Sequence, residues 1–383
     1  MPRSLLLSIF VLVLSSLTRA GGLDVNWMVP ALSQGPCIAS LVSEPAKSKG
    51  CLSWTKNERA TPLFDSVRHQ VYVGGSDGRL HVFSDSKGIL TKTIPLSGNL
   101  VSAPVLVENT LCFGTDTGSL VRMDLDTSKP LWELKLDSEV ENTPLYSNGV
   151  LYVVSGLATL YAVDASKGEV LWQKKRPLPT RIFIGQLSNP VLVGNHIVIG
   201  HPSGRIDFYD SKTGKTILDV MIADPALDFP DVSSSVTESE GSLIAASFNK
   251  GLIALDPVSG NTRWRLLEKE KTQLAVSRTY PGMVFAAGNK SVIGVDSREG
   301  RVLWRFKFKK GSPTSLISKN GLLCFASDRS ALYVLNEKTG QPLQYLGSGL
   351  GFSGGLDFSS NTLFAFSTAG HLYSLSPSLK RKP

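Results

Sequence analysis

Short apolar runs recur along the whole chain and are separated by turns rich in glycine and small polar residues. An apolar run such as 151–154 or 197–200 is followed by a glycine-containing turn and then by an alternating run such as 160–163. Helical periodicity is not sustained over any comparable length. Short strands with turn signals about every ten residues predict an all-β fold.

The runs belong to a repeat of nearly fixed length. Aligning an apolar residue with a small polar residue four positions later brings eight units into register, at intervals of 40, 40, 46, 46, 40, 40 and 40 residues. The apolar positions are Leu80, Leu120, Leu160, Ile206, Leu252, Val292, Leu332 and Leu372. The polar positions are Ser84, Asp124, Asp164, Asp210, Asp256, Asp296, Asn336 and Ser376. A unit of about 40 residues fits one four-stranded propeller blade, so the sequence predicts an eight-bladed β-propeller of antiparallel blades.

Tryptophans occur at a fixed place in these units. Trp172, Trp264 and Trp304 each stand four residues after the glycine that closes a polar turn, and Trp132 occupies the same register. A large ring packed between neighbouring blades buries much apolar area. We interpret these tryptophans as structural docking residues and not as cofactor ligands.

The two ends of the chain complement each other. The eighth unit, at about 356–377, stops before its last strand, and a matching Gly-x-x-x-Trp stands at 50–54 near the N-terminus. We therefore predict that an N-terminal strand at 50–54, with Trp54 as its docking residue, completes the last blade and removes an exposed sheet edge. Residues 46–378 are then the propeller, 21–45 an N-terminal arm of open role, and 379–383 a basic tail.

The first twenty residues have the pattern of a cleavable signal peptide. Arg3 precedes the apolar stretch 5–14, and Thr18-Arg19-Ala20 places small residues at the positions that a signal peptidase reads. The stretch is shorter than the ~20 residues of a membrane span. The first cysteine is Cys37, so no lipid-anchor cysteine follows the apolar stretch, and we expect a protein exported to the periplasm. Cys37 and Cys51 form either a disulfide or two free thiols there.

Composition and charge narrow the function classes. Hydrophobic residues make up 42% and charged residues 19%, which is too apolar for a disordered chain. Five basic residues at the ends account for most of the net charge of +8, and they are Arg3, Arg19, Lys380, Arg381 and Lys382. We therefore expect no nucleic-acid partner. Cys112 and Cys324 lie within apolar strand patterns, so we expect both to be small buried hydrophobes.

The repeat resembles a known family. The units ending at Trp172, Trp264 and Trp304 match or nearly match Ala-x-Asp-x-x-x-Gly-x-x-x-Trp, which is similar to the docking repeat of the pyrroloquinoline-quinone (PQQ) propeller superfamily. Within it, the signal peptide, eight blades and length resemble the BamB family, which supports insertion of β-barrel proteins into the bacterial outer membrane. That resemblance implies a protein partner, the periplasmic domains of the barrel component BamA, and a monomer outside that complex.

The two intervals of 46 residues place insertions around 174–187 and 219–233, and the resemblance implies that these two loops contact BamA. Arg181-Ile-Phe-Ile-Gly185 and then Ser188-Asn-Pro190 correspond to one family stretch, with Ile184 in the place of its Arg. Asp231-Val232-Ser233 corresponds to the other, with Ser233 in the place of an acid. The candidate partner-binding residues are Arg181, Ile182, Phe183, Ile184, Asp231 and Ser233. The alternative is that the apolar members pack the loops onto the ring.

Catalysis is the weaker expectation. The five histidines are scattered without metal-site spacing, and a Walker-type phosphate loop is missing from the sequence. We expect no catalytic residue, metal or cofactor, and a scaffold that acts by protein contacts. Another extracytoplasmic propeller that binds a protein or the cell wall is the alternative, followed by a PQQ-dependent dehydrogenase.

Overall fold

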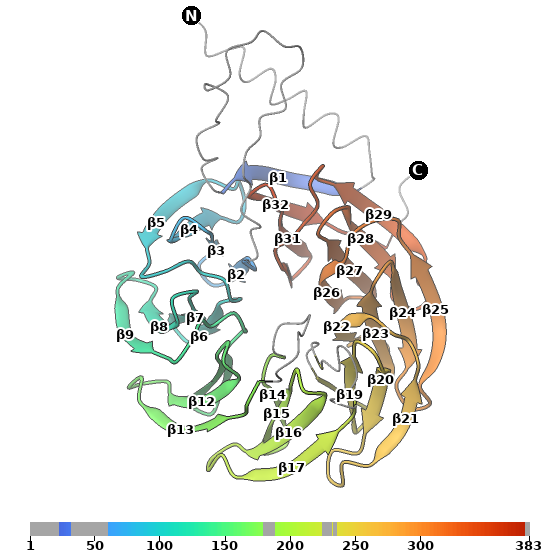
Figure 1. Cartoon of the computed structure of the whole chain (residues 1–383). Helices are drawn as coiled ribbons and strands as arrows, with labels where there is room; N and C mark the ends of the chain where they lie inside the picture. The colour runs from blue at the N-terminus through green and yellow to red at the C-terminus, as the bar shows by residue number, and fades with distance from the viewer. Residues whose placement is uncertain (1–22, 32–59, 179–187, 224–231, 233–235, 380–383) are drawn as a thin grey trace, which may run out of the picture.

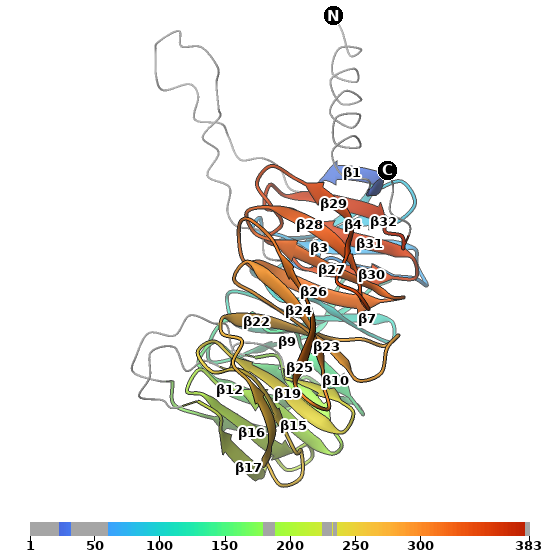
Figure 2. The same ribbon diagram turned by 90° about the vertical axis from the view of Figure 1, so that its right-hand side faces the viewer.

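A computed structural model describes residues 23–31, 60–178, 188–223, 232 and 236–379. Within these residues the chain forms eight four-stranded antiparallel sheets and no helix. The sheets stand radially around one axis, with their first strands innermost (Figure 1), and Figure 2 shows the ring from its side. The predicted eight-bladed β-propeller is confirmed.

The first four blades follow one another along the chain. Blade 1 contains β2 (Leu63–Asp65), β3 (Gln70–Gly74), β4 (Arg79–Ser84) and β5 (Leu90–Pro95). Blade 2 contains β6 (Val105–Val107), β7 (Thr110–Gly114), β8 (Ser119–Asp124) and β9 (Pro130–Lys135). Blade 3 contains β10 (Leu145–Ser147), β11 (Val150–Val154), β12 (Thr159–Asp164) and β13 (Val170–Lys175). Blade 4 contains β14 (Val191–Val193), β15 (His196–Gly200), β16 (Arg205–Asp210) and β17 (Thr216–Met221).

The remaining blades complete the ring. Blade 5 contains β18 (Thr237–Ser239), β19 (Ser242–Ser247), β20 (Gly251–Leu255) and β21 (Thr262–Leu266). Blade 6 contains β22 (Lys271–Val276), β23 (Met283–Gly288), β24 (Ser291–Asp296) and β25 (Arg301–Lys307). Blade 7 contains β26 (Pro313–Lys319), β27 (Leu322–Ser327), β28 (Ala331–Asn336) and β29 (Pro342–Gly347). Blade 8 contains β30 (Leu356–Ser359), β31 (Thr362–Phe366), β32 (His371–Ser376) and the N-terminal strand β1 (Asp24–Pro30).

The closing strand corrects one prediction. An N-terminal strand does complete blade 8, but it is β1, antiparallel to β32, and not the strand expected at 50–54. Residues 50–54, with Trp54, lie outside the described residues. The Gly-x-x-x-Trp spacing pointed to the wrong segment, because the tryptophan of β1, Trp27, has Leu23 and not glycine four positions before it. The segment expected as an arm therefore contains the last strand of the ring.

The apolar core lies between blades, where the two middle strands of each sheet pack on those of the next. In blades 2 and 3, β7, β8, β11 and β12 are buried along nearly their whole length, whereas the outer strands β9 and β13 alternate between partly buried and exposed positions. Cys112 and Cys324 are buried free thiols, as expected. The periodic runs thus encode the core directly.

Tryptophans join consecutive blades by one repeated geometry. Trp132, Trp172, Trp264 and Trp304 each donate their indole N–H to a carbonyl oxygen of the following blade, over 2.8–3.1 Å. Each indole ring packs so closely on the turn glycine of the following blade that a side chain there would collide with it. A Cβ added at Gly168, for example, would lie 2.7 Å from the Trp132 ring. Glycine at the turn is therefore required twice, for its positive φ and for the room it leaves to the ring.

Trp27 makes the same contact across the closure of the ring. It pairs with Ser374 beside a bulge in β1, as Trp172 pairs with Ala162 beside a bulge in β13. Its indole N–H donates to the Asp85 carbonyl oxygen over 2.6 Å, and a Cβ at Gly88 would fall 2.6 Å from its Cε3 atom. Trp27 is therefore the docking residue of blade 8.

Candidate functional site

The two insertions found in the sequence border blade 4. One lies between β13 and β14 and the other between β17 and β18. The candidate residues Arg181, Ile182, Phe183, Ile184, Asp231 and Ser233 lie outside the described residues. The structure therefore describes the base on which both insertions stand, which is blade 4 and the residues that enter and leave it.

Both sides of the second insertion are tied to the turn between β15 and β16. The Ala223 N–H donates to the Gly204 carbonyl oxygen over 3.1 Å, and the Val232 N–H donates to the His201 carbonyl oxygen over 3.2 Å. The Val232 side chain is fully buried and lies where a Cβ on Gly200 would fall, 2.5 Å from its Cγ1 atom. The residue between Asp231 and Ser233 is thus an anchor in the core.

Val232 follows a rule of the repeat. Leu100 stands in the same way against Gly74, and Val140 against Gly114. In each case the segment that enters a blade covers the glycine that ends the second strand of the preceding sheet. Val232, in the middle of the predicted Asp231–Ser233 stretch, therefore has a structural task.

The end of the first insertion is anchored in a comparable way. The Ser188 hydroxyl is buried and accepts the Gly200 N–H over 2.6 Å. Ser102 accepts the Gly114 N–H over 2.9 Å in blade 2, and both serines are followed by x-Pro. The Ser-x-Pro element that resembles the family signature is thus a strand-entry anchor. Both insertions re-enter the ring through rigid, buried contacts.

A buried ionic cluster lies between blades 3 and 4. The Asp207 carboxylate, on β16, is completely buried and accepts two hydrogen bonds from Arg176, over 2.7 and 2.9 Å. Arg176 directly follows β13 and so links blade 3 to blade 4. The Tyr209 hydroxyl donates to the same carboxylate over 2.7 Å. His201 Nε2 lies 3.0 Å from it, at ion-pair distance but outside hydrogen-bonding geometry.

The cluster continues toward solvent through Asp219 on β17. Its two oxygens bind Arg176 over 2.8 Å and Arg205 over 2.5 Å. Burial alone would raise the pKa of Asp207, but His201, Tyr209 and Arg176 together stabilise the carboxylate more and hold its pKa below the ordinary value. A buried carboxylate kept ionised in this way fixes the orientation of the residues around it.

Sequence reasoning missed this cluster, although the repeat contained a signal. The position of Asp207 in the third strand holds Val121, Tyr161, Ile253 and Ile293 in other blades. A charged residue in a column of apolar ones is costly unless it is paired. Among the eight residues that directly follow the aligned apolar positions, only Asp207 is an acid; blade 1 has His81, and the others are apolar or aromatic.

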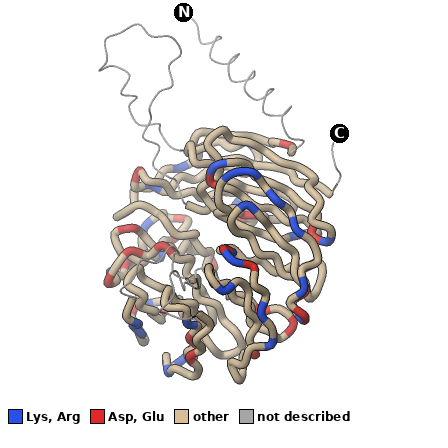
Figure 3. The backbone as a smooth tube through the Cα atoms, turned by 45° about the vertical axis from the view of Figure 1, so that its right-hand side comes forward, with Lys and Arg blue, Asp and Glu red and all other residues tan. Residues whose placement is uncertain are grey.

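Side chains that can bind a metal ion do not gather in the described part of the chain. They contain no group of three or more His, Cys, Asp and Glu side chains that could hold a metal ion. His69 and His81 each pair with a single aspartate, Asp85 and Asp77. No helix among them is long and apolar enough to cross a membrane. Basic and acidic residues occur on every side of the ring visible in Figure 3.

Comparison with known proteins gives related sequences. A protein of Nitrosomonas eutropha named outer membrane protein assembly factor BamB is 23% identical over 221 residues, which are 56% of this chain and 52% of that protein. A protein of the same name from Bordetella pertussis is 28% identical over 197 residues, half of each chain. The match thus spans about half the length of these relatives. A quinohemoprotein alcohol dehydrogenase of Pseudomonas putida is 28% identical over 35% of this chain and 21% of its own.

Solved structures share the fold. The crystal structure of BamB from Moraxella catarrhalis aligns with a TM-score of 0.71 at 18% identity and covers 83% of this chain and 96% of that chain. A quinohemoprotein alcohol dehydrogenase of Pseudomonas putida aligns with a TM-score of 0.68 at 10% identity, over 85% of this chain and 75% of its own. At these identities the alignments establish the propeller architecture alone. The family model for outer membrane protein assembly factor BamB matches residues 47–280, more than half of the chain, and the protein therefore belongs to the BamB family.

Proposed function

We propose that this protein is a non-catalytic scaffold for the assembly of β-barrel proteins into the bacterial outer membrane, and that it binds the periplasmic domains of the barrel component BamA. The observation that carries the proposal is the pair of insertions on either side of blade 4, in a chain of the BamB family. Neighbouring insertions in a repeat protein commonly build one binding face.

Blade 4 suits this task because it offers a rigid base. Arg176, Asp207 and Asp219 join the end of blade 3 to blade 4 through buried or half-buried charged hydrogen bonds. Ser188 and Val232 fix the points where the chain returns from the two insertions. Less conformational entropy is lost on binding when the loops of a binding face start from fixed ends.

In this proposal, Arg181 and Asp231 orient the partner, while Ile182, Phe183 and Ile184 supply apolar contact and Ser233 a polar one. Charged groups at an interface fix register, and buried apolar side chains give most of the affinity. The protein acts in the periplasm after removal of a signal peptide at 1–20, and its partner holds it near the outer membrane.

The test is capture of purified BamA periplasmic domains by the double variant Arg181→Ala/Asp231→Ala. We expect the affinity to fall about tenfold or more while the thermal midpoint is unchanged, because loop charges contribute to docking and not to the core. The matched control is Glu240→Ala/Arg298→Ala, which removes an exposed ion pair with 2.6 Å between its atoms, between blades 5 and 6. Unchanged capture by the first variant would refute the assignment of these residues.

A dehydrogenase is the competing proposal, because part of the chain is similar to quinohemoprotein alcohol dehydrogenases. It predicts that the protein takes up PQQ with calcium and then reduces an electron-accepting dye in the presence of an alcohol. We expect neither a bound-quinone absorbance nor dye reduction. Stoichiometric quinone binding with turnover would overturn the scaffold proposal.

A further inference from the structure

The junction between blades 1 and 2 departs from the tryptophan rule. Lys92 pairs with Val82 in the register where Trp132 pairs with Arg122 and Trp172 with Ala162. Ser128, with a φ of 56°, stands where blade 1 and blades 3 to 7 have their turn glycine. Both halves of the docking pair are thus replaced, and among the residues that the structure describes no indole joins these two blades.

A cavity of about 400 Å³ lies at this junction. Its apolar lining comes from Tyr72, Val82, Ile94 and Leu125, and its polar lining from Arg68, Gln70, Lys92, Asp126 and Ser128. Tyr72 has the register that Tyr152 and Phe285 have in their own blades. Those two rings pack against Trp172 and Trp304, with centroids 6.0 and 5.8 Å apart. The cavity is therefore the place that an indole occupies elsewhere in the ring.

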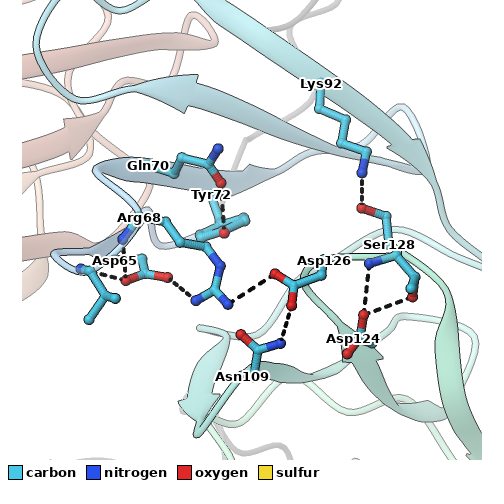
Figure 4. A network of polar contacts seen from close by, with 11 residues as sticks. Asp65, Arg68, Gln70, Tyr72, Lys92, Asn109, Asp124, Asp126 and Ser128 are labelled. Carbon is cyan, nitrogen blue, oxygen red and sulfur yellow. Dashed lines mark hydrogen bonds and ion pairs between the residues drawn. The ribbon is translucent and has the colours of Figure 1, made fainter.

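Polar contacts hold the walls of the cavity in place (Figure 4). Arg68 bridges the blades, with 3.0 Å to Asp65 of blade 1 and 3.2 Å to Asp126 of blade 2. Asn109 donates to the other oxygen of Asp126 over 2.7 Å, and the Lys92 ammonium binds the Ser128 hydroxyl. Because these bonds connect the blades without an indole, the cavity is formed before anything enters it.

The other two junctions without tryptophan are filled by the chain itself. Leu218 of blade 4 stands in the docking register and reaches the turn glycine of blade 5, where a Cβ on Gly260 would fall 2.8 Å from its Cδ2 atom. Gln344 of blade 7 exchanges two hydrogen bonds with Ser378, over 3.0 and 3.4 Å. Replacement of the tryptophan therefore does not by itself leave a cavity. The junction of blades 1 and 2 is different because its own substitute, Lys92, turns to the polar rim.

We propose that this junction is a binding site for an aromatic side chain, tryptophan above all, presented by an extended segment of a partner polypeptide. The floor offers the Tyr72 ring and three aliphatic side chains, as the chain's own docking sites do. The rim offers Asp126 as an acceptor for an indole N–H, and Lys92 and Arg68 as cations beside the ring.

A polypeptide fits better than a free small molecule because an edge strand lines the cavity. Lys92 and Ile94 belong to β5, which is the edge strand of blade 1 and has no strand on its outer side among the described residues. An extended segment can pair with such an edge and insert one side chain, as in strand-addition complexes. The site lies on blades 1 and 2, apart from the blade 4 insertions, so it extends the proposed scaffold function with a second contact.

The test uses two blocked pentapeptides, Ac-Gly-Gly-Trp-Gly-Gly-amide and its Leu counterpart, titrated into the full-length protein with labelled methyl groups. We expect saturable shifts of the methyl signals of Val82, Ile94 and Leu125, contacts from indole protons to these methyls, and about tenfold weaker binding of the Leu peptide. No saturable shift, equal binding of both peptides, or binding of free indole without binding of the Trp peptide would overturn the proposal.

The blocking variant is Lys92→Trp/Ser128→Gly, which installs both halves of the docking pair and fills the cavity from within. We expect this variant to lose Trp-peptide binding and to melt at a higher temperature. The matched control Leu218→Trp places an indole at the junction of blades 4 and 5 beside the existing Gly260, and should bind the peptide as the wild type does. If the blocking variant is folded, as its thermal melt would show, and still binds the Trp peptide, the assigned site is wrong. The contacts between indole protons and methyl groups in the wild type test the site without any variant.

Discussion

The closing contact of the ring gives a prediction that can be worked from the structure. In Trp27→Ala, blade 8 loses a side chain that is 8% exposed, its packing on Phe364, and the 2.6 Å hydrogen bond to the Asp85 carbonyl oxygen. Removing a buried tryptophan costs about 3–5 kcal/mol, and the lost hydrogen bond adds about 1 kcal/mol. We expect the free energy of unfolding to fall by about 4–6 kcal/mol.

Two further variants separate the contribution of the hydrogen bond from that of ring packing, and the closing contact from an ordinary contact between blades. Trp27→Phe keeps most of the ring and loses the donor, so we expect a loss of about 1–2 kcal/mol. Trp132→Ala removes the same type of contact between blades 2 and 3, within a continuous stretch of chain. Urea unfolding followed by far-ultraviolet circular dichroism suits all three variants, because tryptophan fluorescence would change with the substitutions themselves.

A loss of less than about 1 kcal/mol in Trp27→Ala, the scale of an exposed contact, would refute the closing role of Trp27. Trp54→Ala is the decisive comparison, because the spacing of the sequence motif pointed to Trp54 as the closing residue. A large loss with Trp54→Ala together with a small loss with Trp27→Ala would restore the strand first predicted at 50–54.

Four further outcomes follow from the packing and the charges. Gly88→Ala should destabilise the protein more than Gly194→Ala, because both glycines have positive φ but an added Cβ meets a neighbour only at Gly88. In a double-variant cycle measured by urea unfolding, Trp27→Ala should relieve part of that difference. Val232→Ala should cost about 1–3 kcal/mol, whereas Val258→Ala, at a side chain 88% exposed, should leave the urea midpoint unchanged. Folding lowers the pKa of Asp207, so ionisation of this carboxyl group stabilises the protein above about pH 4, and the contribution is lost as the pH falls. Asp207→Asn should therefore lower the free energy of unfolding by about 3–5 kcal/mol at pH 7 and flatten the acid limb of a stability–pH profile. Burial raises the pKa of Cys112 to about 11 and raises that of Cys324, so peptide mapping should find both thiols unmodified by a maleimide in the native protein and modified in urea.

Much of the ring could be predicted because each unit repeats the same local chemistry. The aspartate column is an example: the Asp164 carboxylate accepts the N–H groups of Ser166 and Lys167 in the turn that follows, and Asp256 does the same with Val258 and Ser259. Such turns depend on residues two and three positions away, so they leave a fixed spacing in the sequence. The number of blades follows from that spacing.

The closing strand and the blade 4 cluster escaped prediction for a different reason. β1 meets β32 through residues about 350 positions apart, and Trp27 lacks the glycine that stands four positions before Trp172, Trp264 and Trp304. Asp207 and Arg176 meet across two blades, where spacing within one unit carries no information. The partner-binding residues at 181–184, 231 and 233 lie outside the described residues and stay a proposal.

The pairing of β1 with β32 also governs the order in which the ring forms. Asn26 bonds to Ser374 and Ser376, so blade 8 combines one strand that precedes the other seven blades in the sequence with three strands that follow them. Contacts of such long sequence separation are slow to form, and until they do β32 presents an unpaired edge. A circular permutant that joins β32 to β1 by a short linker would turn this contact into a local hairpin. Its refolding should be faster than that of the natural chain order, with the same eight blades at the end.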